Sequence, residues 1–278
     1  MSRSIEELEE VARRIRVATV KELHTSRSGH PGSSLSIADM IAALYFGGFL
    51  KYDPRNPLWD DRDMFLLSNG HAVPGLYACI ALAGLFPVEK LDGLRKFGTQ
   101  LQGHAKRGSP PGIEISSGSL GQGLSVGVGI ALGLKLQGKP NRVFVMMSDG
   151  EQQEGSTWEA IMFAPKHGLD NLVAIVDKNG NQINGPTNVI MPGLDPLAAK
   201  YEAFHWETTE IDGNDMGQVV KALEQAAGAK GPFAIIANTI TGKGISYMEG
   251  DYHWHHGVIT DELLAKAMDD LGEPVPAR

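Results

Sequence analysis

The chain has 278 residues, of which 42% are hydrophobic and 21% charged, so it is long and apolar enough to fold as one large globular domain. A formal net charge of −8, from 25 Lys and Arg against 33 Asp and Glu, argues against a nucleic-acid or anionic-membrane binder. The one cysteine, Cys79, cannot form an internal disulfide, and the uncharged stretches are too short or too interrupted by proline to cross a membrane. We expect one cytoplasmic domain over residues 1–278, ending in a loose tail over 270–278.

Apolar periodicity predicts helices and strands that alternate along the chain. Ser4 and Glu7 form a capping-box pattern before a helical repeat that starts at Ile5. Further helical patterns occur at 36–49, 124–136, 156–167, 196–204 and 214–227. Short apolar runs predict buried strands at 64–67, 143–147, 172–176 and 233–237. The alternation predicts the α/β class, with a doubly wound, mostly parallel sheet flanked by helices on both faces.

Two polar residues follow predicted neighbouring strands. Asp149 follows the strand at 143–147, and Asn179 follows the strand at 172–176. Because the carboxyl ends of parallel strands open into one crevice, both side chains could meet one hard cation such as Mg²⁺, which prefers oxygen ligands and often carries a diphosphate. Asp-Gly and Asn-Gly are also common turn formers, so these two dipeptides alone leave both interpretations open.

A glycine-rich loop over 118–123 precedes the small-residue helix at 124–136. Glycines at such a place allow the backbone to approach a ligand closely. The loop lacks the Gly-x-Gly-x-x-Gly fingerprint of dinucleotide binding, and Gly150 to Gly155 lacks the Lys-Ser/Thr that completes a P-loop. Within the helix itself, Gly127 and Gly133 are explained by tight packing.

Histidines recur in glycine-flanked segments, where working residues are often found. They are His30, His71, His104 and the run of 253–256 that ends in His256. Imidazoles suit proton transfer and hydroxyl binding near neutral pH. Zinc is the competing interpretation, but the chain has neither a His-Glu-x-x-His nor a Cys-x-x-Cys pattern. The remaining histidines within helical patterns are expected to be surface or core residues: His24, His167 and His205.

Six segments, in order, resemble the amino-terminal, diphosphate-binding half of the transketolase family. They span about 11–257 of this chain and comprise 28–32 (SGHPG), 67–71 (LSNGH), 118–123, 148–155, 177–179 and 256–257. The resemblance implies thiamine diphosphate as cofactor with Mg²⁺, which Ca²⁺ or Mn²⁺ could replace. It implies metal ligands at Asp149, Asn179 and, through its main-chain carbonyl, Asn181. It implies catalytic residues at His30, His71, His104 and His256, and cofactor contacts from His71, Gly118, Ser119, Leu120, Gly150, Glu151, Asn179 and His256.

The chain departs from the family pattern at several positions. Ser148 replaces a usual glycine, Ser119 a usual proline and Asn181 an apolar residue. The chain also stops soon after His256, where full-length transketolases continue into a pyrimidine-binding domain that carries the activating glutamate. The resemblance therefore implies the amino-terminal subunit of a split transketolase, completed by a C-terminal subunit in a heterotetramer and acting on sugars or sugar phosphates.

Two other functions remain open from the sequence. One is a different thiamine-diphosphate reaction on the same frame, such as 1-deoxyxylulose-phosphate formation or a specialised acyl or ketol transfer. The other is a non-catalytic subunit that binds cofactor or partner without turnover. The family's sugar-phosphate-binding arginines lie mostly in the absent half, so the residues of this chain do not decide the donor sugar.

Overall fold

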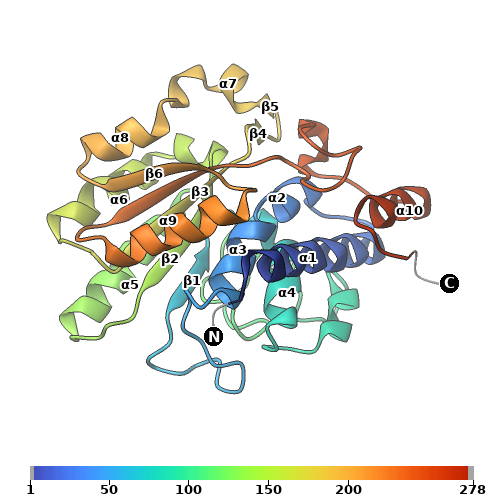
Figure 1. The fold of residues 1–278 in the computed structure, drawn as a ribbon, viewed down its shortest axis with the longest axis horizontal. Helices are drawn as coiled ribbons and strands as arrows, with labels where there is room; N and C mark the ends of the chain where they lie inside the picture. Colours follow the sequence, from blue (N-terminus) through green and yellow to red (C-terminus); the bar gives the residue numbers. More distant parts are fainter. Residues whose placement is uncertain (1–2, 275–278) are drawn as a thin grey trace.

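The computed structural model describes residues 3–274 and is built around one five-stranded sheet. Its strands are β1 Met64–Leu67, β2 Val143–Ser148, β3 Leu172–Lys178, β6 Glu207–Asp212 and β7 Phe233–Asn238, in the order β1-β2-β3-β7-β6. Every neighbouring pair is parallel. Helices cover both faces of the sheet (Figure 1), which confirms the predicted doubly wound fold.

Each face of the sheet has its own hydrophobic core. On β2, Phe144 and Met146 enter one core while Val143, Val145 and Met147 enter the other, as the alternation of a strand requires. The first core is covered by α1 Ile5–Ser26, α3 Ala38–Phe46, α4 Val73–Leu82, α9 Met216–Gly228 and α10 Asp261–Asp270. The second is covered by α5 Gln122–Leu136, α6 Gly155–Lys166 and α8 Leu197–Ala203. Because both faces are covered, the central strands are fully buried.

Short elements connect this frame at its edges. They are α2 Pro31–Ser36, α7 Thr187–Ile190, the two-residue strands β4 Asn181–Gln182 and β5 Gly185–Pro186, and the 3₁₀ turns η1 Gly70–Ala72, η2 Val88–Gly93, η3 Gly150–Gln153, η4 Pro192–Leu194 and η5 Tyr252–His255.

Most predicted elements agree with the structure to within a few residues, and the exceptions have physical reasons. The capping box at Ser4 and Glu7 is formed and begins α1. The helix predicted over 36–49 is shorter in the structure: Ser36 is the last residue of α2, Ile37 separates α2 from α3, and α3 ends at Phe46 with Gly47 as its C-cap. Strand β6 was not predicted, because it is polar and lies at the edge of the sheet, where burial does not impose an apolar pattern.

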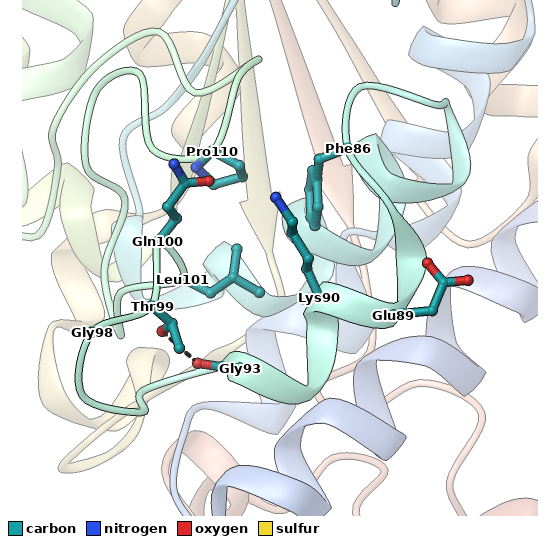
Figure 2. Close-up of a pocket in the computed structure, with 9 residues that line it drawn as sticks. All are labelled: Phe86, Glu89, Lys90, Gly93, Gly98, Thr99, Gln100, Leu101 and Pro110. Carbon is teal, nitrogen blue, oxygen red and sulfur yellow. Dashed lines mark hydrogen bonds between the residues drawn. The ribbon is translucent and has the colours of Figure 1, made fainter.

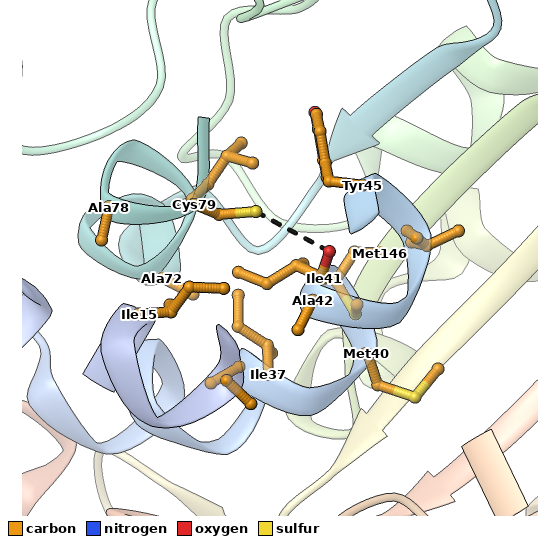
Figure 3. Close-up of a cluster of buried hydrophobic side chains, with 14 of the residues drawn as sticks. Ile15, Ile37, Met40, Ile41, Ala42, Tyr45, Ala72, Ala78, Cys79 and Met146 are labelled. Atoms are coloured by element: carbon orange, nitrogen blue, oxygen red, sulfur yellow. Dashed lines mark hydrogen bonds between the residues drawn. The ribbon is translucent and has the colours of Figure 1, made fainter. Parts of the chain in front are cut away.

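Cys79 is buried between α4 and α3. Its thiol donates to the carbonyl oxygen of Ile41 at 3.7 Å (Figure 3), and burial raises its pKa. No helix within 3–274 is long and apolar enough to cross a membrane. The predicted tail begins with packed residues: Leu271 is buried, and Glu273 pairs with Arg13 at 3.0 Å. Residues 275–278 of that tail lie outside the described range.

Candidate active site

Asp149 and Asn179 lie together at the carboxyl edge of the sheet. Each directly follows its strand, β2 or β3, and both are buried. The Oδ2 of Asp149 accepts hydrogen bonds from the backbone N–H of Gly180 at 2.9 Å and from the Thr187 hydroxyl at 3.2 Å. The two positions singled out in the sequence are therefore neighbours in space.

Three hydrogen bonds orient the side chain of Asn179. Its amide nitrogen donates to Asp177 at 2.8 Å, and its Oδ1 accepts from the N–H of Asn181 at 3.0 Å and from the Thr241 hydroxyl at 3.1 Å. The main-chain carbonyl of Asn179 lies 3.2 Å from the same hydroxyl. A rotation of Thr241 toward that carbonyl would free one lone pair of Oδ1 for a ligand.

The candidate cation site, which we call the cation pocket, contains the buried carboxyl groups of Asp149 and Asp177 and has no cationic partner among residues 3–274. Burial, followed by the charge of Asp177, raises the pKa of Asp149 to about 7, and burial raises the pKa of Asp177 to about 6. No salt bridge to either carboxylate occurs among residues 3–274, and the nearby Lys178 instead pairs with Asp195 at 2.9 Å. Oxygen donors with uncompensated charge fit a hard divalent cation, whose two positive charges would favour both ionised carboxylates.

Glu151 points into the protein. Its Oε1 accepts from the backbone N–H of Gly121 at 2.7 Å and from the Ser68 hydroxyl, and its Oε2 accepts from the N–H of Ser148 at 3.2 Å. The side chain is fully buried, and burial raises its pKa. Glu151 thus anchors the glycine-rich loop to the turn after β2, while the half-buried backbone of Gly150 borders the cation pocket.

The glycine-rich loop leads into α5 through a tight turn. Gly121 takes a left-handed conformation, with φ at 82°, and is the N-cap of α5. A Cβ on Gly123 would stand 2.2 Å from the Ser68 hydroxyl and 2.8 Å from the Ser68 backbone, so only glycine fits there. Gly118 and Ser119 are exposed and Leu120 is half-buried, so all three remain open to a ligand.

The four predicted histidines gather around His30, together with a fifth. The ring centroid of His30 lies 5.3 Å from that of His71, 5.6 Å from His104 and 5.0 Å from His256. His255 joins them at 5.5 Å from His30 and 4.9 Å from His71. The sequence contained a signal for His255, since it lies within the histidine run at 253–256, but nothing in the run distinguished it from its neighbours.

Two local devices bring these histidines together. Gly29 and Gly257 form an antiparallel bridge, in which the N–H of Gly257 donates to the Gly29 carbonyl at 3.0 Å and so places His256 beside His30. The short helix α2 joins the cluster to the cation pocket: Ser33 contacts the Nε2 of His71 at 3.2 Å, and the Ser36 hydroxyl donates to Asp177 at 2.8 Å.

Four imidazoles of this cluster, those of His30, His71, His104 and His255, have lowered pKa values. Burial is the largest cause and the neighbouring imidazoles add to it, so the pKa of His30 falls to about 2 and that of His71 to about 3. Burial also lowers the pKa of His104 and of His255. Neutral imidazoles can both donate and accept hydrogen bonds, as hydroxyl-bearing ligands require.

The other histidines lie elsewhere. His24 contacts Asp261 at 2.9 Å, His167 stacks on Phe163, and His205 is exposed. Within residues 3–274, no group of three or more His, Cys, Asp or Glu side chains is arranged to hold a metal ion. The cation pocket differs from such a group because its donors come from one carboxylate and from amide oxygens.

This combination of a cation pocket, a glycine-rich loop and a histidine cluster can be compared with known proteins. The family model described as "Transketolase, thiamine diphosphate binding domain" matches residues 8–275. The chain belongs to the transketolase family. Relatives include the 6-deoxy-6-sulfo-D-fructose transketolase subunit of Clostridium sp. strain MSTE9, which is 44% identical over 98% of both chains. An apulose-4-phosphate transketolase subunit of Phocaeicola vulgatus is 38% identical, over 98% of this chain and 96% of its own length.

Full-length members of the family are longer than this chain. It matches 43% of the transketolase of Pongo abelii at 39% identity. The solved transketolase of Campylobacter jejuni superimposes on 99% of this chain with a TM-score of 0.92 and 32% identity, and the match covers 45% of that structure. The chain is therefore a transketolase-type subunit that corresponds to the amino-terminal, thiamine diphosphate binding part of these enzymes, as the sequence resemblance predicted.

Proposed function

We propose that this chain catalyses thiamine-diphosphate- and Mg²⁺-dependent transfer of a two-carbon ketol unit from a ketose to an aldose, as the amino-terminal subunit of a split transketolase. The observation that carries the proposal is that His71, His104 and His256 gather around His30, and that α2 links this cluster through Asp177 to the buried Asn179. A subunit that only bound cofactor would need the cation pocket but not a cluster of neutral imidazoles.

The residues of the site would have three roles: to hold the cation, to border the cofactor and to bind the sugar. Asp149 and Asn179 would hold Mg²⁺ through side-chain oxygens, Asn181 through its main-chain carbonyl, and Gly150 and the 118–120 backbone would border the cofactor. When bound, thiamine diphosphate supplies a nucleophilic carbon that carries the two-carbon unit from donor to acceptor. The neutral imidazoles would hydrogen-bond the sugar hydroxyls and move the proton released when the bond between C2 and C3 of the ketose breaks.

The catalytic site would be completed by a second polypeptide. The relatives of similar length are named as subunits, and full-length transketolases are more than twice as long as the part that matches. We propose that a C-terminal subunit supplies the pyrimidine domain and the activating glutamate, in a heterotetramer of two copies of each chain.

The names of two relatives support ketoses with a terminal anionic group as donors. One relative is named for a sulfonated fructose and the other for a sugar phosphate. A 1-deoxyxylulose-phosphate type of reaction is the remaining alternative, and it uses a 2-oxo acid rather than a ketose as donor.

The test is to purify the tagged chain gently from its native host, identify what co-purifies, and assay ketol transfer with thiamine diphosphate and Mg²⁺. We expect a stoichiometric second chain with a pyrimidine-type domain and activity that neither chain shows alone. A lone, inactive chain that still binds cofactor would support the non-catalytic alternative, and turnover of a 2-oxo acid but not of ketoses would support the other.

A further inference from the structure

Arg95 lies in the segment that leads to His104 and adopts an unusual backbone conformation. Its φ is 57°, in the left-handed region that disfavours a residue with a side chain. Its N–H donates to the carbonyl of Leu101 at 2.9 Å, which closes the segment into a loop between η2 and His104. Backbone strain of this kind persists where the surroundings hold a residue in place.

The guanidinium of Arg95 is wedged between two segments that carry site histidines. Its Nη1 donates to the Ser28 hydroxyl at 2.7 Å, two residues before His30. A Cβ on Gly103, the residue before His104, would stand 2.6 Å from the Nε of Arg95. Arg95 therefore contacts both chain segments close to their histidines, at Ser28 and at Gly103.

A cavity of about 340 Å³ borders the same loop (Figure 2). It is lined by Phe86, Glu89, Lys90, Gly93, Gly98, Thr99, Gln100, Leu101 and Pro110. Within the loop, the Thr99 hydroxyl donates to the Gly93 carbonyl at 2.6 Å. Leu94 and Leu101 anchor the loop in the hydrophobic core, and the Tyr77 hydroxyl donates to the Gln102 carbonyl at 3.2 Å. The contacts of Arg95 with Ser28 and Gly103 add a direct tie between this loop and the His30 segment.

The positive charge of Arg95 has no acidic partner within 3–274, whereas the arginines in salt bridges each face a carboxylate. Its charge acts on His30 and on His104 and adds to the lowering of both pKa values, after burial. The other titratable groups that act on His30 are His71, His255 and His256. His104 is faced by the His30 ring and interacts with His71, and no carboxylate is among these groups.

We propose that Arg95 is a positioning residue that holds the His30 and His104 segments together and places an unpaired positive charge near both imidazoles. The consequence for catalysis rests on the proposed ketol transfer, while the effect on the histidines does not. Without the positive charge of Arg95, we expect His104 to protonate at higher pH. Without the guanidinium between the two segments, we expect the segment that leads to His104 to shift toward the adjacent cavity.

The first test follows the histidine ring protons by NMR across a pH titration of the full chain. We expect Arg95→Gln to raise the titration midpoint of His104 by about half a pH unit or more, the size expected for one nearby charge screened by water. Arg95→Lys, which keeps the charge, should move it less. Arg107→Gln removes an exposed charge from the same region and should leave the midpoint unchanged. An equal midpoint in Arg95→Gln and the wild type would overturn the proposal.

A second variant separates the wedge from the charge. In Gly103→Ala the new methyl group displaces the guanidinium but leaves its charge on the chain, so His30 and His104 ring signals should shift together. This variant and Arg95→Lys keep the proposal testable if Arg95→Gln does not fold. Unshifted His30 signals in Gly103→Ala would contradict the wedge.

With the partner subunit present, the acid limb of the kcat/KM profile should move to higher pH in Arg95→Gln and return in Arg95→Lys. If the complex shows no ketol transfer but the NMR midpoint still moves, the proposed function fails and the role of Arg95 stands. If ketol transfer is present and neither the limb nor the midpoint moves, the role of Arg95 is wrong.

Discussion

At the scale of single residues, the two halves of the site place opposite demands on buried charge. The histidine cluster lowers imidazole pKa values by burial and mutual repulsion, while the sheet edge raises the pKa values of Asp149 and Asp177. The histidine cluster needs no added charge, because a neutral imidazole can be buried without a counter-ion. In the second half, a bound cation would lower the raised pKa values of Asp149 and Asp177 and so favour ionisation of both carboxylates near neutral pH.

His71 makes the free energy of unfolding sensitive to acid. Its folded pKa of about 3 lies below its ordinary value of 6.5, so between these values the unfolded chain binds a proton that the folded chain does not. The contribution of neutral His71 to the free energy of unfolding is fully present above pH 6.5. Between pH 6.5 and the folded pKa of about 3, this contribution falls by about 1.4 kcal/mol for each pH unit. We expect His71→Asn to lose less stability than the wild type between about pH 7.5 and pH 5 in urea unfolding. Parallel losses in the two proteins would contradict the assignment.

Asp149 is the residue on which cofactor binding should depend most. Asp149→Ala removes the proposed carboxylate ligand of Mg²⁺, so we expect Mg²⁺-dependent binding of thiamine diphosphate to fall by about 100-fold, the upper end of the loss seen even when a partner of a metal ligand is removed. Isothermal calorimetry with and without a chelator measures this. Asp170→Ala, an exposed residue paired with Lys135, is the control. Unchanged affinity in Asp149→Ala would remove the metal assignment.

At the scale of elements, the position of the glycine-rich loop over 118–123 depends on how closely the backbone of α5 approaches the sheet. Gly123 lies in the first turn of α5 against Ser68, and Gly127 lies 2.5 Å, by its missing Cβ, from Val145 of β2. These contacts let α5 lie directly on the sheet, while Glu151 ties the turn before it to the end of β2. The interpretation of Gly127 as a packing residue agrees with this contact, whereas Gly133 has nothing within 4 Å of its missing Cβ.

Two glycines of α5 should therefore respond oppositely to alanine. Gly123→Ala places a methyl group against the Ser68 backbone, so we expect a loss of roughly 1–3 kcal/mol in the free energy of unfolding, typical of overpacking, and weaker cofactor binding. Gly133→Ala meets open space within the helix and should stabilise the lone chain by up to about 1 kcal/mol. Thermal and urea unfolding of the two variants measure these changes. A loss of stability indicates that packing dominates at that position, and a gain indicates that conformational entropy of the unfolded chain dominates.

At the scale of the whole molecule, one side of the chain is unusually apolar. Helix α5 has a single charged residue, Lys135, and leaves Val126 43% and Leu136 80% exposed. Met162 and Phe163 of the adjacent α6 are 59% and 40% exposed. A helix that is apolar on every side is usually buried, so this face is the place where we expect assembly.

Charges on that face should weaken assembly without unfolding the chain. We expect Val126→Glu and Met162→Glu to lower the mass of the complex with the partner subunit in analytical ultracentrifugation, while the melting temperature of the lone chain stays within a few degrees. Leu58→Glu changes a more exposed apolar residue in the loop before β1 and serves as the control. Intact complexes in both α5–α6 variants would show that assembly uses another face.

The sequence by itself determined the strands that are buried on both faces, since their apolar runs are short, rich in β-branched residues and bounded by turn residues, and it determined the residues that follow them. It also indicated the family, because six short segments, five of which contain glycine or histidine, occur in the family's order. Only the tertiary structure decided how these segments meet. His255, the inward direction of Glu151, edge strand β6 and the wedge of Arg95 depend on contacts between residues far apart in the chain, such as the 2.7 Å bond from Arg95 to Ser28. Local periodicity carries no information about such contacts, because burial and charge are properties of the packed molecule.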